Sequence, residues 1–235
     1  MKKLIPFLIV HLVCALCNPQ QAAATTPDPT TEIVRIYAHV TTDDSILQGT
    51  GWFINNHTLI TDYHVIRNCD KIAVVWSDKK WSPAKILNAQ PRLDLVALDV
   101  LEPRADQEFI EVIPDSDTVQ CGQRVTAYGY PNNDWRVSYG TVSHRYSQNG
   151  GEHVAVWGSN DLALDHGGSG SPVCDDAGLV VGIAKSISKP GLPYEFFIIT
   201  VNVIWEALGL TNKNHPNGFT TGVTDGLDLD FSQAS

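Results

Sequence analysis

The chain has 235 residues, a formal net charge of -10 and an apolar content of 43%. This length and apolar content suffice for one large or two small domains with a substantial buried core. The acidic balance argues against the basic surface that nucleic-acid-binding proteins use, so we expect no nucleic-acid partner.

The first residues, 1–24, have the pattern of a secretory signal peptide. Two lysines precede the apolar run LIPFLIVHLVCALC, and a small-residue cleavage pattern ends at Ala24. The run is shorter than the ~20 residues that span a bilayer, so we expect export and no stable membrane insertion after cleavage. A lipid anchor on Cys17 is a weaker alternative, because Leu16 stands where a small residue would be expected.

Three cysteines follow that segment, at Cys69, Cys121 and Cys174. An oxidising compartment permits one disulfide and one free thiol among them. The sequence leaves the three pairings open.

After a short linker at residues 25–31, short apolar or alternating runs recur, separated by turn residues. They are rich in Val, Ile, Tyr, Phe and Thr, and their spacing of roughly ten residues is typical of an all-β sandwich or barrel. We expect strands within residues 32–40, 51–61, 71–76, 93–100, 109–113, 123–131, 139–145, 153–157, 179–187 and 195–200.

The strands divide into two similar groups, residues 32–113 and 118–200, with a linker at 102–108. One helix is expected at 201–210, where apolar residues can share a face and a glycine offers a stop. The remaining residues, 211–235, form a polar, acidic tail that we expect to be flexible.

The stretch DHGGSGSPVCDDAG contains four glycines and one proline around Ser169. A serine hydroxyl is a poor nucleophile unless a base takes its proton and a third group orients that base. His64 is the candidate base, because it follows the apolar strand in LITDYHVI directly. This chemistry therefore requires a carboxylate that can orient His64.

The candidate carboxylate is Asp94 in RLDLVALDV. In an extended strand it would share a face with Val96 and Leu98, and an ionised aspartate on a buried face needs a partner. Asp99 is an alternative deeper in the run. Alternatively, Asp94 caps the end of a strand and remains exposed to solvent.

Together these motifs resemble the trypsin/chymotrypsin-like serine proteases, and among them the bacterial HtrA-type (DegP-like) protease domains without a PDZ domain. The resemblance covers residues 32–210 through GTGWFI and LITDYHVI, then LDLVALDV, then GGSGSP. It implies an all-β fold of two antiparallel, chymotrypsin-like β-barrels with a short C-terminal helix. It also implies a periplasmic or extracellular location in a bacterium.

The resemblance further implies a serine endopeptidase acting on polypeptide substrates. Ser169 would attack the scissile carbonyl, His64 would act as general base and then general acid, and Asp94 would orient it. The backbone N–H groups of Gly167 and Ser169 would form the oxyanion hole. No cofactor and no metal ion is expected.

Gly168 departs from the family pattern, which has Asp or Asn before the serine. Without a carboxylate there, activation by a newly released N-terminus is not expected, and the loop is less constrained. By similarity, the primary specificity pocket would be lined by four residues without an acidic side chain, which favours cleavage after a small or aliphatic residue. These residues are Leu164, Ser186, Ile187 and Ser188.

Three other protein classes match parts of this pattern. A protease-fold binding module without turnover stays open because of Gly168. An α/β-hydrolase is disfavoured, because Ser171 replaces the last glycine of G-x-S-x-G and only His215 follows the serine. A metal site is disfavoured, since the chain has no H-E-x-x-H motif.

Overall fold

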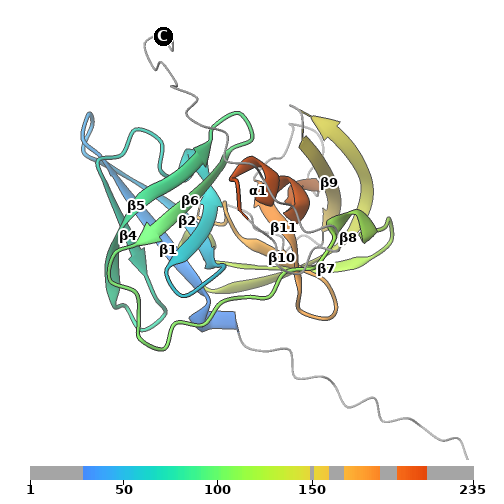
Figure 1. The fold of residues 1–235 in the computed structure, drawn as a ribbon, viewed down its shortest axis with the longest axis horizontal. Helices are drawn as coiled ribbons and strands as arrows, with labels where there is room; N and C mark the ends of the chain where they lie inside the picture. Colours follow the sequence, from blue (N-terminus) through green and yellow to red (C-terminus); the bar gives the residue numbers. More distant parts are fainter. Residues whose placement is uncertain (1–28, 149–150, 159–166, 186–194, 211–235) are drawn as a thin grey trace, which may run out of the picture.

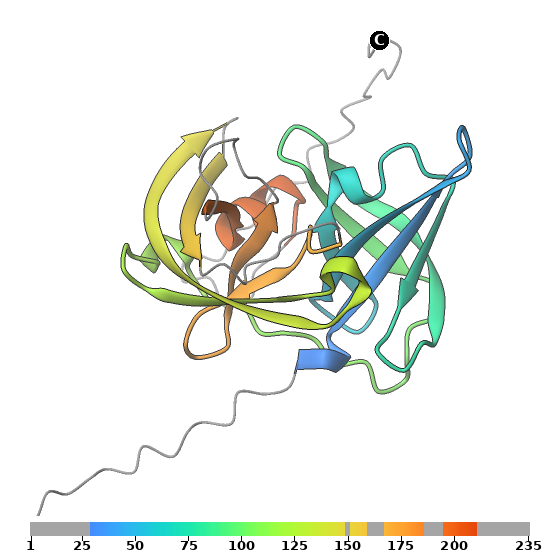
Figure 2. The ribbon, with the colours of Figure 1, turned by 180° about the vertical axis from the view of Figure 1, so that it is seen from behind.

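The computed structural model describes residues 29–148, 151–158, 167–185 and 195–210. Two closed, six-stranded antiparallel barrels lie side by side, and one helix follows the second barrel (Figure 1). The view from behind shows the same arrangement (Figure 2). The expected all-β, double-barrel fold class is confirmed.

The first barrel has the strand order β1-β2-β3-β6-β5-β4 and closes through pairing of β1 with β4. Every neighbouring pair is antiparallel. Its strands are β1 (Ile33–Val40), β2 (Ser45–Phe53), β3 (Thr58–Asp62), β4 (Lys71–Val75), β5 (Trp81–Gln90) and β6 (Leu95–Val100).

The second barrel has the order β10-β11-β12-β9-β8-β7 and closes through pairing of β10 with β7. A helix, α1 (Val201–Ala207), follows it and covers the first part of the expected helical stretch. The strands are β7 (Arg124–Gly129), β8 (Arg136–Gln148), β9 (Gly151–Gly158), β10 (Pro172–Cys174), β11 (Val180–Lys185) and β12 (Glu195–Thr200).

The two barrels share a core, and β3 lies at their junction. Its five residues are all buried, although a barrel strand normally buries one face and exposes the other. Leu59 belongs to the cluster inside the first barrel, whereas Ile60 packs with Ile183 and Ile199 of the second barrel. The end of β3 therefore points into the interface between the barrels.

The expected strand at residues 51–61 is wrong as a single element, because it covers the end of β2, a turn and β3. The expected strand at 109–113 contributes only an isolated bridge between Val112 and Val180. β10 was not expected, since it contains only three residues and begins with Pro172.

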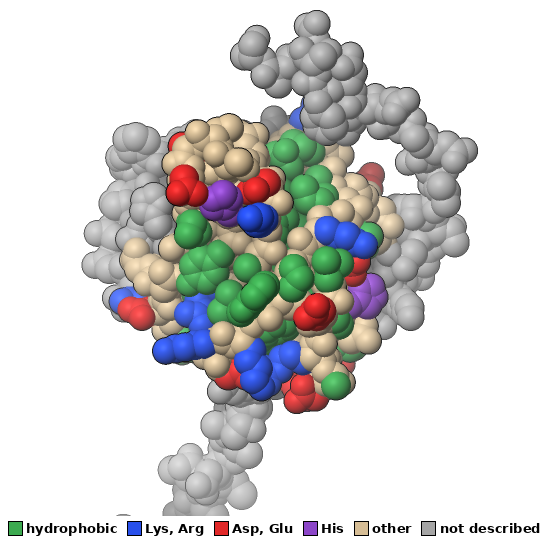
Figure 3. All heavy atoms as spheres, turned by 90° about the vertical axis from the view of Figure 1, so that its left-hand side faces the viewer, with side chains coloured by type: hydrophobic (Ala, Val, Ile, Leu, Met, Phe, Trp, Pro, Cys, Tyr) green, Lys and Arg blue, Asp and Glu red, His purple; other side chains and the backbone are tan. Residues whose placement is uncertain are grey.

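β5 was also not expected, because its sequence WSPAKILNAQ contains a proline and is mostly exposed or half-buried. Trp81 and Leu87 are among its exposed residues. In Figure 3, apolar side chains gather on this outer side of the first barrel. Because its composition resembles that of an exposed edge strand, β5 was not predicted, although the barrel needs it to close.

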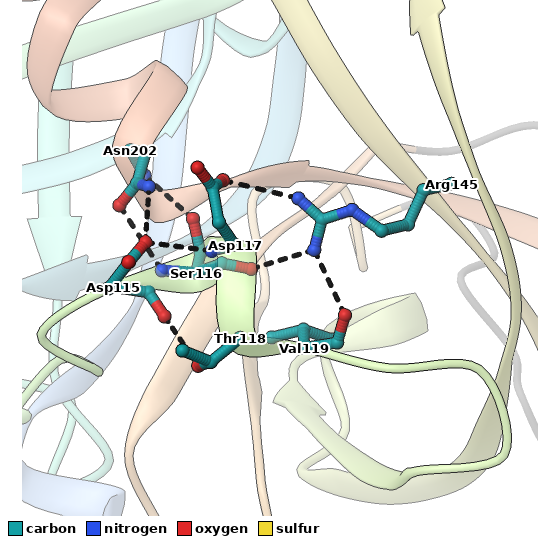
Figure 4. A network of polar contacts seen from close by, with 7 residues as sticks. All are labelled: Asp115, Ser116, Asp117, Thr118, Val119, Arg145 and Asn202. Carbon is teal, nitrogen blue, oxygen red and sulfur yellow. Dashed lines mark hydrogen bonds and ion pairs between the residues drawn. The ribbon is translucent and has the colours of Figure 1, made fainter.

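The connection between the barrels is held by a polar network (Figure 4). Asn202 of α1 donates from Nδ2 to Asp115 Oδ1 at 2.8 Å and from its backbone N–H to Ser116 Oγ at 3.0 Å. Arg145 of β8 donates to the carbonyls of Ser116 and Val119 at 2.9 and 3.0 Å. These bonds fix the connection to the second barrel.

The three cysteines after the leader segment are not joined to one another. Cys69, Cys121 and Cys174 are all free thiols, so the structure forms none of the three disulfide pairings that the sequence permits. In the part of the chain that the structure describes, no helix is both long and apolar enough to cross a membrane.

Candidate active site

His64 lies where β3 leaves the barrel junction. β3 ends at Asp62, and a 3-10 turn at Tyr63–Val65 carries the imidazole out of the core. The His64 side chain is 43% exposed, so one side of the ring reaches the surface. The sequence placed His64 directly after an apolar strand, and the structure agrees.

Asp94 contacts His64 through both carboxylate oxygens. Oδ1 accepts the backbone N–H of His64 at 2.8 Å, and Oδ2 lies 2.8 Å from Nδ1 of the same residue. The Tyr63 N–H also donates to the Asp94 carbonyl at 2.9 Å. Together these contacts fix both the ring and the short turn that carries it.

The expectation that Asp94 lies on the buried face of an extended strand is wrong. β6 begins at Leu95, and Asp94 ends the preceding turn with φ +64°. Aspartate is one of the few non-glycine residues that adopt this left-handed region readily. The turn directs the carboxylate back to His64 and leaves its side chain only 16% exposed.

Asp99, the alternative carboxylate, has different partners. Its Oδ1 lies 3.0 Å from His57 Nδ1 and its Oδ2 lies 3.2 Å from Lys85 Nζ. These partners occupy the surface of the first barrel. Asp99 is therefore not the partner of His64.

Burial and pairing act in opposite directions on the pKa values of His64 and Asp94. Burial acts to raise the pKa of Asp94, but the hydrogen bond from His64 and the charges of His64 and Lys185 outweigh it, so the pKa is lowered. Burial acts to lower the pKa of His64, but the hydrogen bond to Asp94 and the negative charge around the ring outweigh it, so the pKa is raised. An ionised Asp94 favours the His64 tautomer with its proton on Nδ1 and leaves Nε2 as the acceptor.

Ser169 is held by the first barrel although it lies between β9 and β10 of the second barrel in the sequence. Its carbonyl accepts the backbone N–H of Thr50 at 2.8 Å. The Thr50 hydroxyl donates to the Gly167 carbonyl at 2.7 Å and accepts the Tyr130 N–H at 3.0 Å. Thr50, a buried residue of β2, was missed from the sequence because its hydroxyl could not be assigned a partner there.

Two glycines of the serine loop have backbone conformations that other residues avoid. Gly167 has φ +97°, and a Cβ there would lie 2.6 Å from the Tyr130 carbonyl oxygen. Gly170 has φ +87°, and a Cβ there would lie 2.2 Å from the Thr50 carbonyl oxygen. The loop can therefore pack against the Tyr130 segment at Gly167, and against β2 and β3 at Gly170, only with glycine at these positions.

The same loop presents backbone donors beside a nearly buried serine. Ser169 is 7% exposed. Neither the Gly167 nor the Ser169 N–H donates a hydrogen bond to a residue that the structure describes. This arrangement leaves both amides available to an oxyanion.

His64 and Ser169 are not joined by a hydrogen bond within the described residues. Their segments are nevertheless packed together, because a Cβ at Gly170 would lie 3.2 Å from the Asp62 backbone nitrogen, two residues before His64. Hydrogen bonds of catalytic groups are often long before substrate binds.

Two charged residues near His64 were not assigned to the site from the sequence. Asp62 is fully buried and its Oδ2 lies 4.0 Å from His64 Nδ1. Lys185, at the end of β11, places Nζ 3.9 Å from Asp94 Oδ2. An aspartate that ends an apolar strand in LITDYH was the signal that could have pointed to Asp62.

Asp62, His64 and Asp94 also form the metal-like cluster of the described residues, with one ligand atom from each within 4.8 Å of the others. The ammonium group of Lys185 lies against the Asp94 carboxylate and opposes the binding of a cation there.

The four residues expected to line the specificity pocket lie outside the described residues. They are Leu164, Ser186, Ile187 and Ser188.

A family model for the trypsin-like peptidase domain matches residues 49–183, which is more than half of the chain. The curated "Probable periplasmic serine endoprotease DegP-like" of Brucella suis biovar 1 (strain 1330) is 32% identical over 148 residues, covering 62% of this chain and 28% of that protein. The "Magnetosome formation protease MamE" of Paramagnetospirillum magneticum (strain AMB-1) is 33% identical over 150 residues, covering 60% of this chain and 20% of that protein.

Solved structures show the same fold. The active form of the Rv3671c protease from M. tuberculosis superposes with a TM-score of 0.66 at 21% identity, covering 85% of this chain and 88% of that chain. The HtrA-type protease AlgW with a tripeptide gives a TM-score of 0.68 at 20% identity, covering 79% and 61%. The match spans less than a third of the two curated relatives described above.

Proposed function

This chain belongs to the trypsin-like peptidase family, and we propose that it is a serine endopeptidase in which Ser169, His64 and Asp94 form the catalytic triad. The observation that carries the proposal is the double contact of the Asp94 carboxylate with His64, at 2.8 Å to the backbone N–H and 2.8 Å to Nδ1. This contact orients the His64 imidazole and leaves Nε2 as its acceptor nitrogen. The His64 segment packs against the loop in which Ser169 lies between Gly168 and Gly170.

In the proposed reaction, His64 Nε2 takes the proton of the Ser169 hydroxyl while Oγ attacks the carbonyl carbon of the scissile peptide. The imidazolium then gives that proton to the leaving amine, which breaks the C–N bond and leaves an ester on Ser169. Water, deprotonated by His64, attacks the ester carbonyl; the bond to Ser169 Oγ breaks, His64 returns the proton to Oγ, and the carboxylic acid product is released. Asp94 stabilises the imidazolium in both steps.

The tetrahedral oxyanion would accept hydrogen bonds from the Gly167 and Ser169 amides, neither of which donates to a described residue. Gly168, between them, adds backbone freedom to the loop. The backbone of this oxyanion hole would therefore become fully ordered only when substrate binds.

The proposed substrates are polypeptides cleaved after a small or aliphatic residue. We also propose that residues 1–24 direct export to the periplasm or the medium and that residues 32–210 form the protease domain. The apolar leader sequence and the word "periplasmic" in the names of the DegP-like relatives support this location.

The test is the intact mass of the purified protein after reaction with a fluorophosphonate probe. A single adduct is expected on the wild type and none on Ser169→Ala. Ser171→Ala is the matched control, because it removes a buried serine hydroxyl from the same loop and should keep the adduct. No adduct on a folded wild type would overturn the proposal and favour a binding module.

A further inference from the structure

Asp62 is a buried carboxyl group that the proposed reaction does not use. It is the last residue of β3, its side chain is fully buried, and neither carboxyl oxygen has a hydrogen-bond partner among the described residues. A buried polar group without a partner costs free energy, and an ionised one costs far more. The protonation state of Asp62 therefore matters for the whole site.

The charged groups around Asp62 come from three elements. His64 follows it in the same segment, with Nδ1 4.0 Å from Asp62 Oδ2, and Asp94 faces it from the turn before β6. Lys185 of β11 brings the fixed positive charge, and its Nζ lies 3.9 Å from Asp94 Oδ2. From the serine loop, the Gly170 N–H also favours the ionised form of Asp62, although it donates to the Ala184 carbonyl at 3.2 Å.

Among the described residues, one lysine is thus available for the two carboxyl groups, and it lies against Asp94 and not against Asp62. Asp94 also receives both hydrogen bonds from His64, whereas Asp62 receives none from a described side chain. When two carboxyl groups share a site, the group with partners takes the charge and the other takes the proton.

From this geometry we propose that Asp62, beside the candidate catalytic site, is a neutral carboxylic acid at pH 7 and leaves Asp94 as the single negative charge orienting His64. The inference rests on the proposed function, since it assigns a role toward the proposed base. Burial and the Asp94 charge raise the pKa of Asp62 well above the ordinary aspartate value, while the His64 and Lys185 charges act in the opposite direction.

The neutral form has a consequence for catalysis. His64 accepts the serine proton only while it is unprotonated. A second carboxylate charge at 4.0 Å from Nδ1 would favour the imidazolium and remove the base at neutral pH. The proton on Asp62 therefore keeps His64 available at lower pH than two ionised carboxylates would allow.

The direct test is carbon NMR of protein labelled with ¹³C at the aspartate carboxyl groups, in the Ser169→Ala chain to prevent self-cleavage. The Asp62 signal is identified as the one missing in Asp62→Asn, or by backbone correlation if that variant does not fold. At pH 7 it should have the chemical shift of a carboxylic acid. The shift of a carboxylate at pH 7 would overturn the inference.

The second readout is the pH dependence of fluorophosphonate labelling at Ser169. Because asparagine is neutral and of similar size, Asp62→Asn should leave the midpoint of the acid limb within ~0.3 pH unit of the wild type. A fall of about one unit or more would mean that Asp62 is ionised while His64 titrates, and would overturn the inference. A wild type that is never labelled refutes the proposed function instead, whatever the Asp62 signal shows.

Discussion

Thr50 donates its backbone N–H to the Ser169 carbonyl at 2.8 Å, so a strand of the first barrel fixes a residue from the second half of the chain. The Thr50 side chain adds a bond to the Gly167 carbonyl on the same loop, and Thr61 Oγ1 in β3 donates to the Thr50 carbonyl at 2.7 Å. β2 and β3 thereby link the serine loop to the segment that carries His64.

Replacing Thr50 with valine should weaken both the fold and the site. Valine keeps the shape of threonine but leaves the Tyr130 N–H and the Gly167 carbonyl without the hydroxyl. We expect urea unfolding to show a loss of about 1–3 kcal/mol, the cost of buried polar groups without partners. Thr50→Ser keeps the hydroxyl and should lose less; equal losses in both variants would contradict this role.

Replacing Asp94 with asparagine should slow fluorophosphonate labelling by a factor of about 10³–10⁴, because the amide cannot hold His64 in the tautomer that accepts the serine proton. Asp99→Asn is the matched control, since Asp99 also pairs with a histidine, His57, and lies outside the site. Its labelling rate should remain within about threefold of the wild type. Comparable losses in the two variants would argue against Asp94 as the orienting residue.

The labelling rate should be lost as the pH falls through the pKa of His64. Burial acts to lower that pKa, but the hydrogen bond to Asp94 and the negative charge around the ring outweigh it, so it lies above the ordinary histidine value. Only the neutral imidazole accepts the serine proton, so activity is present above this pKa and absent below it. A pH series should place the midpoint above about 6.5, and a rate that keeps rising toward pH 4 would refute His64 as the base.

Two glycines with similar backbone angles should respond differently to alanine. Gly170 has φ +87° and a Cβ there would meet the Thr50 carbonyl oxygen at 2.2 Å, whereas Gly178 has φ +83° with open space around its Cβ. Gly178→Ala should cost about 1–2 kcal/mol from its backbone conformation alone. Gly170→Ala should cost more than about 4 kcal/mol, because backbone must move. Thermal and urea unfolding measure both; equal costs would disprove the close approach.

Several features could be predicted from the sequence because they depend on local pattern. The alternation of apolar residues predicted strands and an all-β fold, since one face of each barrel strand must be buried. The exposed β5 and the three-residue β10 could not be predicted, because their pairing depends on barrel closure and not on their own composition.

The candidate residues His64, Asp94 and Ser169 could be selected from the sequence by residue type and by the strands and glycines around them. Their arrangement required the tertiary structure. The left-handed turn at Asp94, the hold of Thr50 on the serine loop and the burial of Asp62 behind His64 all depend on contacts between segments far apart in the chain. The amino-acid pattern determined which groups are present, and the packing of two barrels decided which of them meet, because burial and charge pairing arise only where separate strands come together.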